Sequence, residues 1–549
     1  MDYEALAELL FGDIDLTPDD IYKMYPERNL PEGALVTRIA PSPTGFVHFG
    51  NLVPAITSER MAHQSGGVFY LRIEDTDAKR EVPGAVEVIM KAFGTFGLNF
   101  DEGATIDGDN GAYGPYRQRQ REKIYKTFAK QLVKEGKAYP CFCSEDELSK
   151  IHGEQEKEKS NFGYFGKWAK CRDLSFDEIK KNIDMGKSFV LRFKSEGNPE
   201  NKIKFKDLVK GEIDLSENDM DHVLLKSDGI PTYHFAHVVD DHLMGTTHVV
   251  RGDEWLSTLP FHLQLFRAIG WRAPKYLHVS PLMKLDGESK RKLSKRKDPE
   301  AALTFYASEG YPSEAVYEYI LTLLNSGFED WRRQNPDVSA RDYKFQYKKM
   351  SVSGALFDIV KLNDVSKNYV SRLSAEKVYD EVATWAEEYD KDFYSLFTRD
   401  KAYTTEILKI GRGGKKPRKD FGIWSEVKGY MDFFFDELFA PDYTFDEKLD
   451  KSDIRAILEE YKDIYSSDDD NSVWFDKIRE LSEKHGFCKD VKAYKENPEG
   501  FKGHVGDVSM ILRVAVCGRT NSPDMYSVFK ILGKERLTER IDRALKAIK

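Results

Sequence analysis

The chain has 549 residues, 40% of them hydrophobic and 32% charged, and carries a formal net charge of −10 at pH 7. This length predicts about two to four domains, and the charge excludes a protein that coats nucleic acid with its whole surface, although not a local basic face. No stretch approaches the roughly 18 uncharged apolar residues of a membrane span, and the first residues lack the features of a secretory signal. Five cysteines cannot all pair and favour a reducing compartment, so we expect a cytoplasmic protein without membrane association.

Residues 1–34 are acidic, with nine Asp or Glu against two Lys or Arg. The stretch 13–18 has the composition of a turn between two short helices. We expect this segment to be a peripheral helical extension.

Strand and helix patterns alternate over residues 35–115, which we interpret as the first half of a sheet domain. In chain order, the predicted elements are strand 35–40, helix 51–65, strand 68–73 and helix 84–96. This alternation predicts an α/β fold with a parallel sheet, whose ligands bind at the carboxyl ends of the strands. His48 and Glu74 follow predicted strands and fall at such ends.

The pattern loosens over residues 116–227, which we interpret as an insertion between two halves of the sheet domain. Residues 228–361 are predicted to complete that domain. Strand-like runs resume at 223–225, 233–239 and 247–250.

The remaining residues, 362–549, show the spacing of long amphipathic helices and few strand signals. The acidic patch 466–471 is predicted to be a solvated loop between two of these helices. An all-helical region is therefore expected to follow the sheet domain.

The segment after the first predicted strand has residues suited to nucleotide binding. Gly45 and Gly50 remove side chains where a nucleotide must lie close to the backbone, and His48 can donate a hydrogen bond to a phosphate oxygen. For His-x-Gly alone, an ordinary turn before a helix would be the better interpretation.

A second, basic segment lies far along the chain. Lys292, Lys295 and Arg296 surround Ser294, whose small side chain leaves room for a phosphate. Such cations stabilise the charge that develops when a carboxylate attacks the α-phosphate of ATP, and that reaction needs no protein nucleophile. A basic run is usually a solvated surface, but the occurrence of both segments in this order favours an ATP site.

These two segments also resemble the His-x-Gly signature and the Lys-Met-Ser-Lys-Ser loop of class I aminoacyl-tRNA synthetases. Several surrounding motifs resemble the bacterial glutamyl-tRNA synthetases: 38–45 Arg-Ile-Ala-Pro-Ser-Pro-Thr-Gly, 72–77 Arg-Ile-Glu-Asp-Thr-Asp, 231–236 Pro-Thr-Tyr-His-Phe-Ala, 239–245 Val-Asp-Asp-His-Leu-Met-Gly and 251–255 Arg-Gly-Asp-Glu-Trp. The resemblance covers residues 36–549 and is densest in the sheet domain. It implies a Rossmann-like catalytic domain in two halves, an inserted domain that binds the tRNA acceptor end, stem-contact helices before residue 361 and an anticodon-binding region after it.

The implied reaction is ATP-dependent ligation of L-glutamate to tRNA(Glu) through glutamyl-adenylate, with Mg²⁺ accompanying the ATP. Whether tRNA(Gln) is also charged is left open, and we expect a monomer. Three alternative functions are less compatible with the sequence. A glutaminyl-tRNA synthetase is disfavoured by the pair Arg38 and Arg251, since a neutral glutamine side chain would not need a second arginine. It is also disfavoured by the lack of β-rich sequence after residue 362. A glutamyl transferase that modifies a tRNA base would not need residues 362–549, and a scaffold with a dead active site would not need His48 and Lys295.

Charge predicts how glutamate is held. A planar guanidinium is the best partner for a carboxylate, and a carboxylate is the best partner for an ammonium. The motifs supply Arg38 and Arg251 for the two carboxylates and Glu74 for the ammonium. The alternative for Arg251 is an ordinary salt bridge with Asp253. His237 stands where some relatives carry Asn. The family resemblance places Arg38, Glu74 and Arg251 around the amino acid, together with Ala40, Ser42 and Tyr233.

For ATP, the resemblance implies contacts to ribose and adenine from Glu254 and from the backbone of Met283, with the phosphates between His48 and Lys295. The residues expected at ATP are His48, Gly50, Asn51, Glu254, Met283, Lys292, Ser294, Lys295 and Arg296. Those expected to act in catalysis are His48, Lys292 and Lys295.

Cys141, Cys143 and Cys171 raise the question of zinc, because some relatives bind zinc with Cys-x-Cys followed by Cys-x-His. Asp173 replaces that histidine here, and Tyr164 is a second candidate ligand. Structural zinc sites prefer four N or S ligands, so we expect reduced thiols and no bound metal, with zinc left open.

Residues 411–419 form a basic stretch interrupted by glycines, which is either a solvated linker or a contact to the anticodon arm. Unstacked anticodon bases are read by hydrogen bonds and guanidinium stacking, so Arg418 is the residue expected to read a base.

Overall fold

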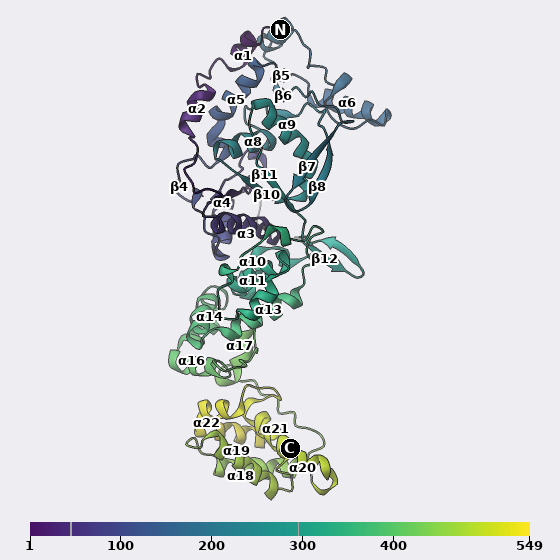
Figure 1. Ribbon diagram of the computed structural model, residues 1–549. Coiled ribbons are helices and arrows are strands. Elements are labelled where there is room, and N and C mark those ends of the chain that lie inside the picture. Colours follow the sequence, from purple (N-terminus) through teal and green to yellow (C-terminus); the bar gives the residue numbers. More distant parts are fainter. Residues whose placement is uncertain (44–46, 295, 549) are drawn as a thin grey trace. The chain divides into compact units, whose positions relative to one another are not determined.

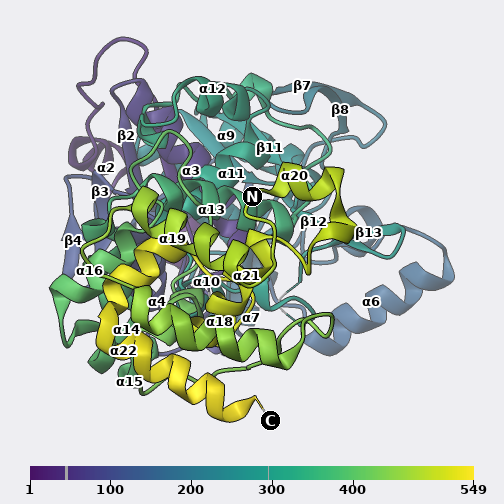
Figure 2. The same cartoon turned by 90° about the horizontal axis from the view of Figure 1, so that it is seen from below.

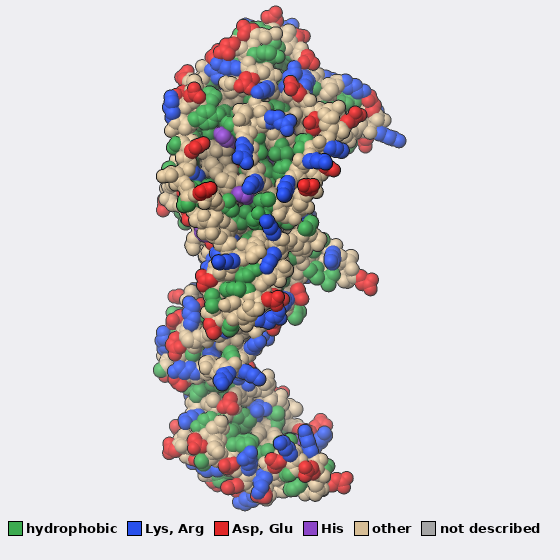
Figure 3. All heavy atoms as spheres, in the orientation of Figure 1, with side chains coloured by type: hydrophobic (Ala, Val, Ile, Leu, Met, Phe, Trp, Pro, Cys, Tyr) green, Lys and Arg blue, Asp and Glu red, His purple; other side chains and the backbone are tan. Residues whose placement is uncertain are grey.

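The computed structural model describes residues 1–43, 47–294 and 296–548, and it divides into two compact units (Figures 1 and 2). The first unit comprises Met1–Phe305 and Tyr317–Asp358, and the second comprises Tyr306–Val316 and Ile359–Lys549. Of the helices described, none has the length and apolar character needed to cross a bilayer. Figure 3 shows basic and acidic side chains interspersed on the face in view, so the net negative charge does not make that face uniformly acidic.

The centre of the first unit is a sheet in the order β1-β2-β3-β4. Its strands are β1 (Val36–Ile39), β2 (Val68–Leu71), β3 (Glu102–Thr105) and β4 (Gly108–Asn110). β1 to β3 run parallel and β4 is antiparallel. Every residue of β1 is buried, as expected for a strand covered on both faces.

A second parallel pair continues this layer. β10 (His248–Gly252) pairs with β11 (Lys275–Val279), and the backbone of Thr247 donates a hydrogen bond of 2.9 Å to the carbonyl of Val36 in β1. The strands predicted at 35–40, 68–73 and 247–250 and the helices predicted at 51–65 and 84–96 are thereby confirmed. The helices that accompany these strands are α3 (Phe49–Gln64), α4 (Ala85–Thr95), α8 (Tyr233–Leu243) and α9 (Leu259–Ile269).

The strand predicted at 233–239 is wrong, because this stretch opens helix α8. Its Phe and Val residues favour strands by local propensity, but Phe235, Val238 and Val239 are all completely buried on the helix. Tertiary packing of a helix that is buried on several sides therefore overrides the local preference.

The N-terminal segment forms the two short helices that were predicted, α1 (Tyr3–Phe11) and α2 (Pro18–Met24). It is anchored to the sheet and not only peripheral. α1 packs against α5 (Glu122–Lys134), and both Nη atoms of Arg28 lie 2.8 Å from the carboxylate of Glu102 in β3.

The segment predicted as an insertion has a sheet of its own, in the order β5-β6-β9. Its elements are β5 (Ala138–Cys141), α6 (Glu145–Lys157), α7 (Phe176–Asp184), β6 (Val190–Phe193), the hairpin of β7 (Lys202–Asp207) and β8 (Gly211–Ser216), and β9 (Val223–Leu225). β7 lies next to β11 of the central layer. A second hairpin pairs β12 (Met283–Asp286) with β13 (Ser289–Lys292). Lys292, the first cation of the basic segment, is therefore the last residue of a strand, and Ser294 and Arg296 follow that strand.

Helices make up the rest of the chain: α10 (Leu303–Glu309), α11 (Ser313–Leu324), α12 (Phe328–Gln334), α13 (Ile359–Arg372), α14 (Ala375–Tyr389), α15 (Lys391–Thr398), α16 (Lys401–Lys409), α17 (Ser425–Met431), α18 (Lys451–Ile464), α19 (Asn471–Lys484), α20 (Val491–Glu496), α21 (Val505–Cys517) and α22 (Met525–Ala547). No strand forms among the described residues 359–548, which confirms the all-helical prediction. The acidic patch 466–471 is the predicted loop, and Asp470 ends it by capping α19.

Candidate active site

A cavity of about 670 Å³ lies in the first unit at the carboxyl ends of β1, β10 and β11. It is where ligands bind in open parallel sheets. Its wall includes most of the residues that the sequence nominated, which are Arg38, Ala40, Ser42, His48, Gly50, Asn51, Glu74, Tyr233, Arg251, Glu254, Lys292, Ser294 and Arg296.

Three nominated residues are exceptions. Met283 is not on the wall, and its backbone N–H and carbonyl bond to Ala355 and Phe357 at 3.0 and 2.7 Å. Gly45 and Lys295 lie outside the described residues.

The local backbone explains two of the glycines at this cavity. A Cβ atom at position 50 would lie 2.9 Å from Nδ1 of His48, so a side chain there would collide with the imidazole. A Cβ atom at position 252 would lie 2.1 Å from Oε2 of Glu254, which is closer than van der Waals contact, so the carboxylate would have to move. Asn51 accepts a hydrogen bond of 3.0 Å from the backbone of His48, which fixes the start of α3.

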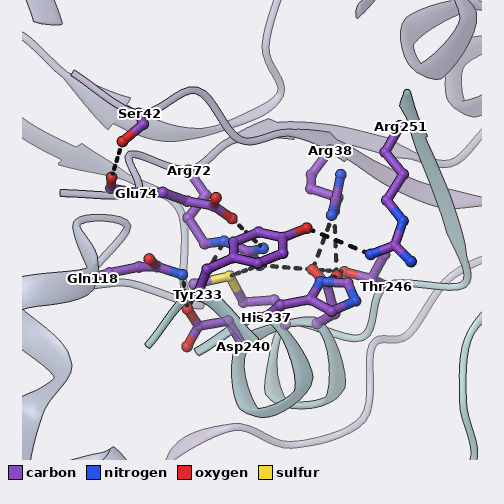
Figure 4. Close-up of polar contacts among 12 residues, drawn as sticks. Arg38, Ser42, Arg72, Glu74, Gln118, Tyr233, His237, Asp240, Thr246 and Arg251 are labelled. Atoms are coloured by element: carbon purple, nitrogen blue, oxygen red, sulfur yellow. Dashed lines mark hydrogen bonds and ion pairs between the residues drawn. The ribbon is translucent and has the colours of Figure 1, made fainter. Parts of the chain in front are cut away.

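A buried network of charges includes Arg38 and Glu74 of the cavity wall (Figure 4). Nε of Arg38 lies 3.2 Å from Asp241, and Nη1 of Arg72 lies 2.7 Å from the same carboxylate. Nη2 of Arg72 lies 3.2 Å from Glu74. Burial alone would raise the pKa of Asp241, but the two guanidinium groups hold it well below its usual range. Burial raises the pKa of Glu74 against the opposing effect of the same arginines.

A second layer of this network lies behind Arg72. Arg121 pairs with Asp240 at 2.7 Å, and Asp240 also accepts hydrogen bonds from Gln118 at 2.9 Å and Tyr125 at 2.8 Å. Three guanidinium groups thus face three carboxylates, so this part of the site is close to neutral. The residues are Arg38, Arg72 and Arg121 against Glu74, Asp240 and Asp241.

Sequence reasoning assigned no role to Arg72, Arg121, Asp240 or Asp241. A signal is present in the sequence, because Arg72 interrupts an apolar strand and the Asp pair follows the largely apolar run 235–239, where unpaired charges would be costly. His237, which stands where some relatives carry Asn, is fully buried with Nδ1 2.7 Å from Asp241 and is not on the wall of the cavity.

Arg251 has a different environment. It is 5% exposed, and its neighbours are uncharged acceptors. Nε donates to His278 at 3.0 Å and Nη1 to His262 at 3.1 Å, with longer contacts of 3.5 Å to the Tyr233 hydroxyl and 3.4 Å to the Trp255 carbonyl. Among the residues that the structure describes, no carboxylate lies within ion-pair distance of Arg251. The predicted alternative is not observed, because Asp253 pairs with Lys210 at 3.0 Å.

A buried carboxylate, that of Asp298, contacts the basic segment at Ser294. Asp298 accepts from the backbone N–H of Ser294 at 2.9 Å and binds both Nη atoms of Arg291. The hydrogen bonds from Arg291 hold the pKa of Asp298 well below its usual range. Lys292, Ser294 and Arg296 lie on the cavity wall.

Away from this cavity, the sulfur atoms of Cys141, Cys143 and Cys171 lie within 4.8 Å of one another. The Tyr164 hydroxyl lies 3.3 Å from Cys143 and accepts a hydrogen bond from the backbone of Cys171 at 3.0 Å. Asp173 points elsewhere and pairs with Lys194 at 3.2 Å. The three thiols therefore form a cluster that is compatible with zinc. The Tyr164 phenol beside them is not one of the N or S ligands that structural zinc sites prefer.

In the second unit, Arg418 forms a fork onto Asp420, at 2.8 Å from Nε and 2.6 Å from Nη2. Its side chain is 43% exposed. The residue expected to read a base therefore has an intramolecular partner that a ligand would have to displace.

Comparisons with known proteins agree with this arrangement. Residues 34–364 match the family "tRNA synthetases class I (E and Q), catalytic domain", and residues 418–545 match "Anticodon binding domain". The chain is 50% identical to the glutamate–tRNA ligase of Clostridium perfringens over 98% of its own length and 100% of that protein, and 50% identical to that of Acetivibrio thermocellus over 99% and 100%. A crystal structure of a glutamate tRNA ligase from Elizabethkingia meningosepticum, in complex with its amino acid, superposes with a TM-score of 0.77 at 29% identity, covering 94% of this chain and 100% of that one.

The cavity is lined by the buried Arg38 and Arg251, by His48 and Gly50 at the start of α3, and by the basic segment. The sequence that supplies these residues matches glutamate–tRNA ligases over nearly its whole length. The chain belongs to the class I aminoacyl-tRNA synthetases of the glutamate and glutamine group.

Proposed function

We propose that this chain is a glutamate–tRNA ligase. The observation that carries the proposal is the buried guanidinium of Arg251, which has no carboxylate partner among the described residues. A buried charge without a counter-charge is costly, and the side-chain carboxylate of glutamate supplies one. The amide of glutamine would not.

The rest of the amino acid fits the neighbouring charges. Glu74 accepts the ammonium group, and Arg38 faces the other carboxylate. The half-buried ring of Tyr233 packs against Trp255, with 4.3 Å between the ring centroids, and forms the floor for the aliphatic part of the substrate. Ala40 and Ser42 complete this end of the cavity, where Ser42 donates a hydrogen bond of 2.8 Å to the carbonyl of Glu74.

ATP enters as its magnesium complex and takes the remaining wall. His48, Gly50 and Asn51 line the cavity at the start of α3, and Lys292, Ser294 and Arg296 line it opposite. The α-carboxylate of glutamate attacks the α-phosphate, and pyrophosphate leaves. The cations of the basic segment, Lys295 among them, stabilise the charge of the departing pyrophosphate. The terminal ribose hydroxyl of tRNA then attacks the adenylate carbonyl, and AMP leaves.

The other regions have supporting roles in this proposal. Residues 116–227 bind the acceptor end, and residues 362–549 bind the anticodon arm. The match of residues 418–545 to an anticodon-binding domain supports the second assignment and opposes a transferase that modifies a tRNA base. Zinc, if held by Cys141, Cys143 and Cys171, is structural, because this cluster is separate from the cavity wall.

A charging assay with the purified chain tests the proposal. With ATP and glutamate it is expected to aminoacylate tRNA(Glu), and with glutamine it is expected not to. Charging of glutamine in preference to glutamate would contradict the proposal. The same assay with purified tRNA(Gln) decides whether this second tRNA is also a substrate.

A further inference from the structure

The orientation of Arg251 depends on imidazole rings. A guanidinium has five N–H donors and no acceptor, so each ring nitrogen that faces it must present a lone pair. Nε2 of His278, at 3.0 Å, and Nδ1 of His262, at 3.1 Å, are these two acceptors. Both rings are therefore neutral, with the proton on the nitrogen remote from Arg251.

Asp207 selects this tautomer of His278. The carboxylate oxygen Oδ2 lies 2.7 Å from Nδ1 of His278 and accepts its proton in a hydrogen bond. The carboxylate is fixed in turn by backbone N–H groups, at 2.9 Å from Val209 and 2.8 Å from Lys210. Asp207 and His278 are both buried, so water does not compete for these bonds.

His262 is held in the same way on the other side. Since its Nδ1 accepts from Arg251, its Nε2 carries the proton and donates it to Nδ1 of His234 at 2.9 Å. Burial lowers the pKa of His262 well below its usual range, and the charge of Arg251 acts in the same direction. Burial likewise lowers the pKa of His234 to about 4. These rings remain neutral acceptors at neutral pH.

We propose that Asp207, His278 and His262 are positioning residues that aim Arg251 with neutral acceptors and so leave its charge for the substrate, which makes them determinants of selectivity for a side-chain carboxylate over an amide. The inference rests on the proposed function. The contrast with the neighbouring arginines supports it, because Arg38 and Arg72 are oriented by Asp241 and share its charge. A carboxylate in the place of His262 would orient Arg251 equally well and would also neutralise it.

A matched pair of variants at position 262 separates orientation from charge. In His262→Asn, the amide oxygen still accepts from Arg251 and no charge is added. In His262→Asp, the side chain has the same size as Asn but carries a negative charge. Selectivity is measured as the ratio of kcat/KM for glutamate to that for glutamine, by ATP–pyrophosphate exchange in the full chain with tRNA(Glu) present.

The Asp variant is expected to lower this ratio by about 10- to 100-fold, mainly through the KM for glutamate, which is the usual effect of losing one charged hydrogen bond. The Asn variant is expected to stay within about threefold of the parent ratio, and the KM for ATP is expected to be unchanged in both. An Asp variant with the parent ratio, or an Asn variant with the same loss as Asp, would overturn the inference.

A second pair covers the case in which the Asp variant does not fold, as judged by thermal unfolding. His278→Gln keeps an acceptor toward Arg251 and a donor toward Asp207, so it is expected to retain selectivity. In Asp207→Asn, the single amide oxygen is retained by the backbone N–H groups of Val209 and Lys210, so an NH2 donor faces Nδ1 of His278 and selects the opposite tautomer. This variant is expected to raise the KM for glutamate without changing that for ATP. Equal glutamate KM values in these two variants would overturn the inference. A parent chain that does not activate glutamate at all would instead overturn the proposed function.

Discussion

Arg291 donates hydrogen bonds from both terminal nitrogens of its guanidinium to the carboxylate of Asp298, at 2.6 and 2.8 Å. Asp298 also accepts the backbone N–H of Ser294, so a carboxylate that is 1% exposed ties the β12–β13 hairpin to the basic segment that follows it. This contact therefore links the basic segment to the hairpin through a buried charge.

The first prediction concerns this anchor. Asp298→Asn removes the charge that holds Arg291 and is expected to slow adenylate formation by about tenfold, since hydrogen bonds to charged groups contribute roughly 1.5–3 kcal/mol. ATP–pyrophosphate exchange measures the effect. The KM for glutamate is expected to be unchanged, because Asp298 is not on the cavity wall. Equal effects on the KM for glutamate and on kcat would indicate a general loss of structure instead.

Lys295 is predicted to stabilise charge on the reacting phosphates. Lys295→Ala is expected to slow exchange by about 100-fold, a typical loss for one electrostatic contact to a transition state, with little change in glutamate binding. Lys297→Ala, which removes a neighbouring exposed cation, is the matched control and is expected to have a small effect. Similar losses in both variants would mean that the segment acts only through its overall charge.

Arg251 is predicted to hold the side-chain carboxylate. Arg251→Ala is expected to raise the KM for glutamate by roughly 100-fold and to relax discrimination against glutamine, because the buried counter-charge is lost. Kinetics with both amino acids provide the measurement. If the two respond by the same factor, Arg251 is not the selecting residue.

The ion pair between Arg28 and Glu102 is predicted to stabilise the N-terminal segment on the sheet. Arg28→Ala is expected to reduce the free energy of unfolding by about 2 kcal/mol, because both side chains are largely buried. Lys23→Ala, which breaks an exposed pair with Asp20, is the control and is expected to change it very little.

This pair also predicts a pH dependence. Burial by itself would raise the pKa of Glu102, but hydrogen bonds from Arg28 and Tyr116 lower it below its ordinary value. The stabilisation is therefore complete above the pKa of Glu in the unfolded chain and is lost as the pH falls through the lower pKa of the folded state. Urea unfolding between neutral and acid pH measures it, and a difference between parent and Arg28→Ala that does not shrink in acid would contradict the assignment.

Arg418 is predicted to read an anticodon base. Arg418→Ala is expected to reduce discrimination among tRNAs that differ in the third anticodon base more than overall affinity, whereas Lys416→Ala in the same basic stretch is expected to weaken all of them alike. Charging rates on such tRNAs measure both. An identical loss on every anticodon would make Arg418 a phosphate contact. Full activity on all of them would leave residues 411–419 as a linker.

The sequence by itself determined the elements that depend on local pattern. The β-branched run before Pro41 became β1, the aromatic and aliphatic run after Gly67 became β2, the apolar spacing after His48 became α3, and the last third of the chain became helical. The parallel arrangement brings strand ends to one edge, so the strand pattern places His48 and Glu74 at one site, and the family resemblance adds Arg251 to it.

Only the tertiary structure decided which charges pair. Helix α8 forms where local propensity predicts a strand, because burial on several sides outweighs the preference of Val and Phe, and this places Asp241 under Arg38 and Arg72. Tyr164, and not Asp173, lies among the three thiols. Arg38 lies within a β-strand pattern in the sequence, and Arg251 directly follows one. In the structure Arg38 lies beside the carboxylate of Asp241, whereas Arg251 lies beside the imidazoles of His262 and His278. Such differences come from contacts between segments far apart in the chain, whose energies depend on burial and distance, and neither quantity is encoded in a local pattern.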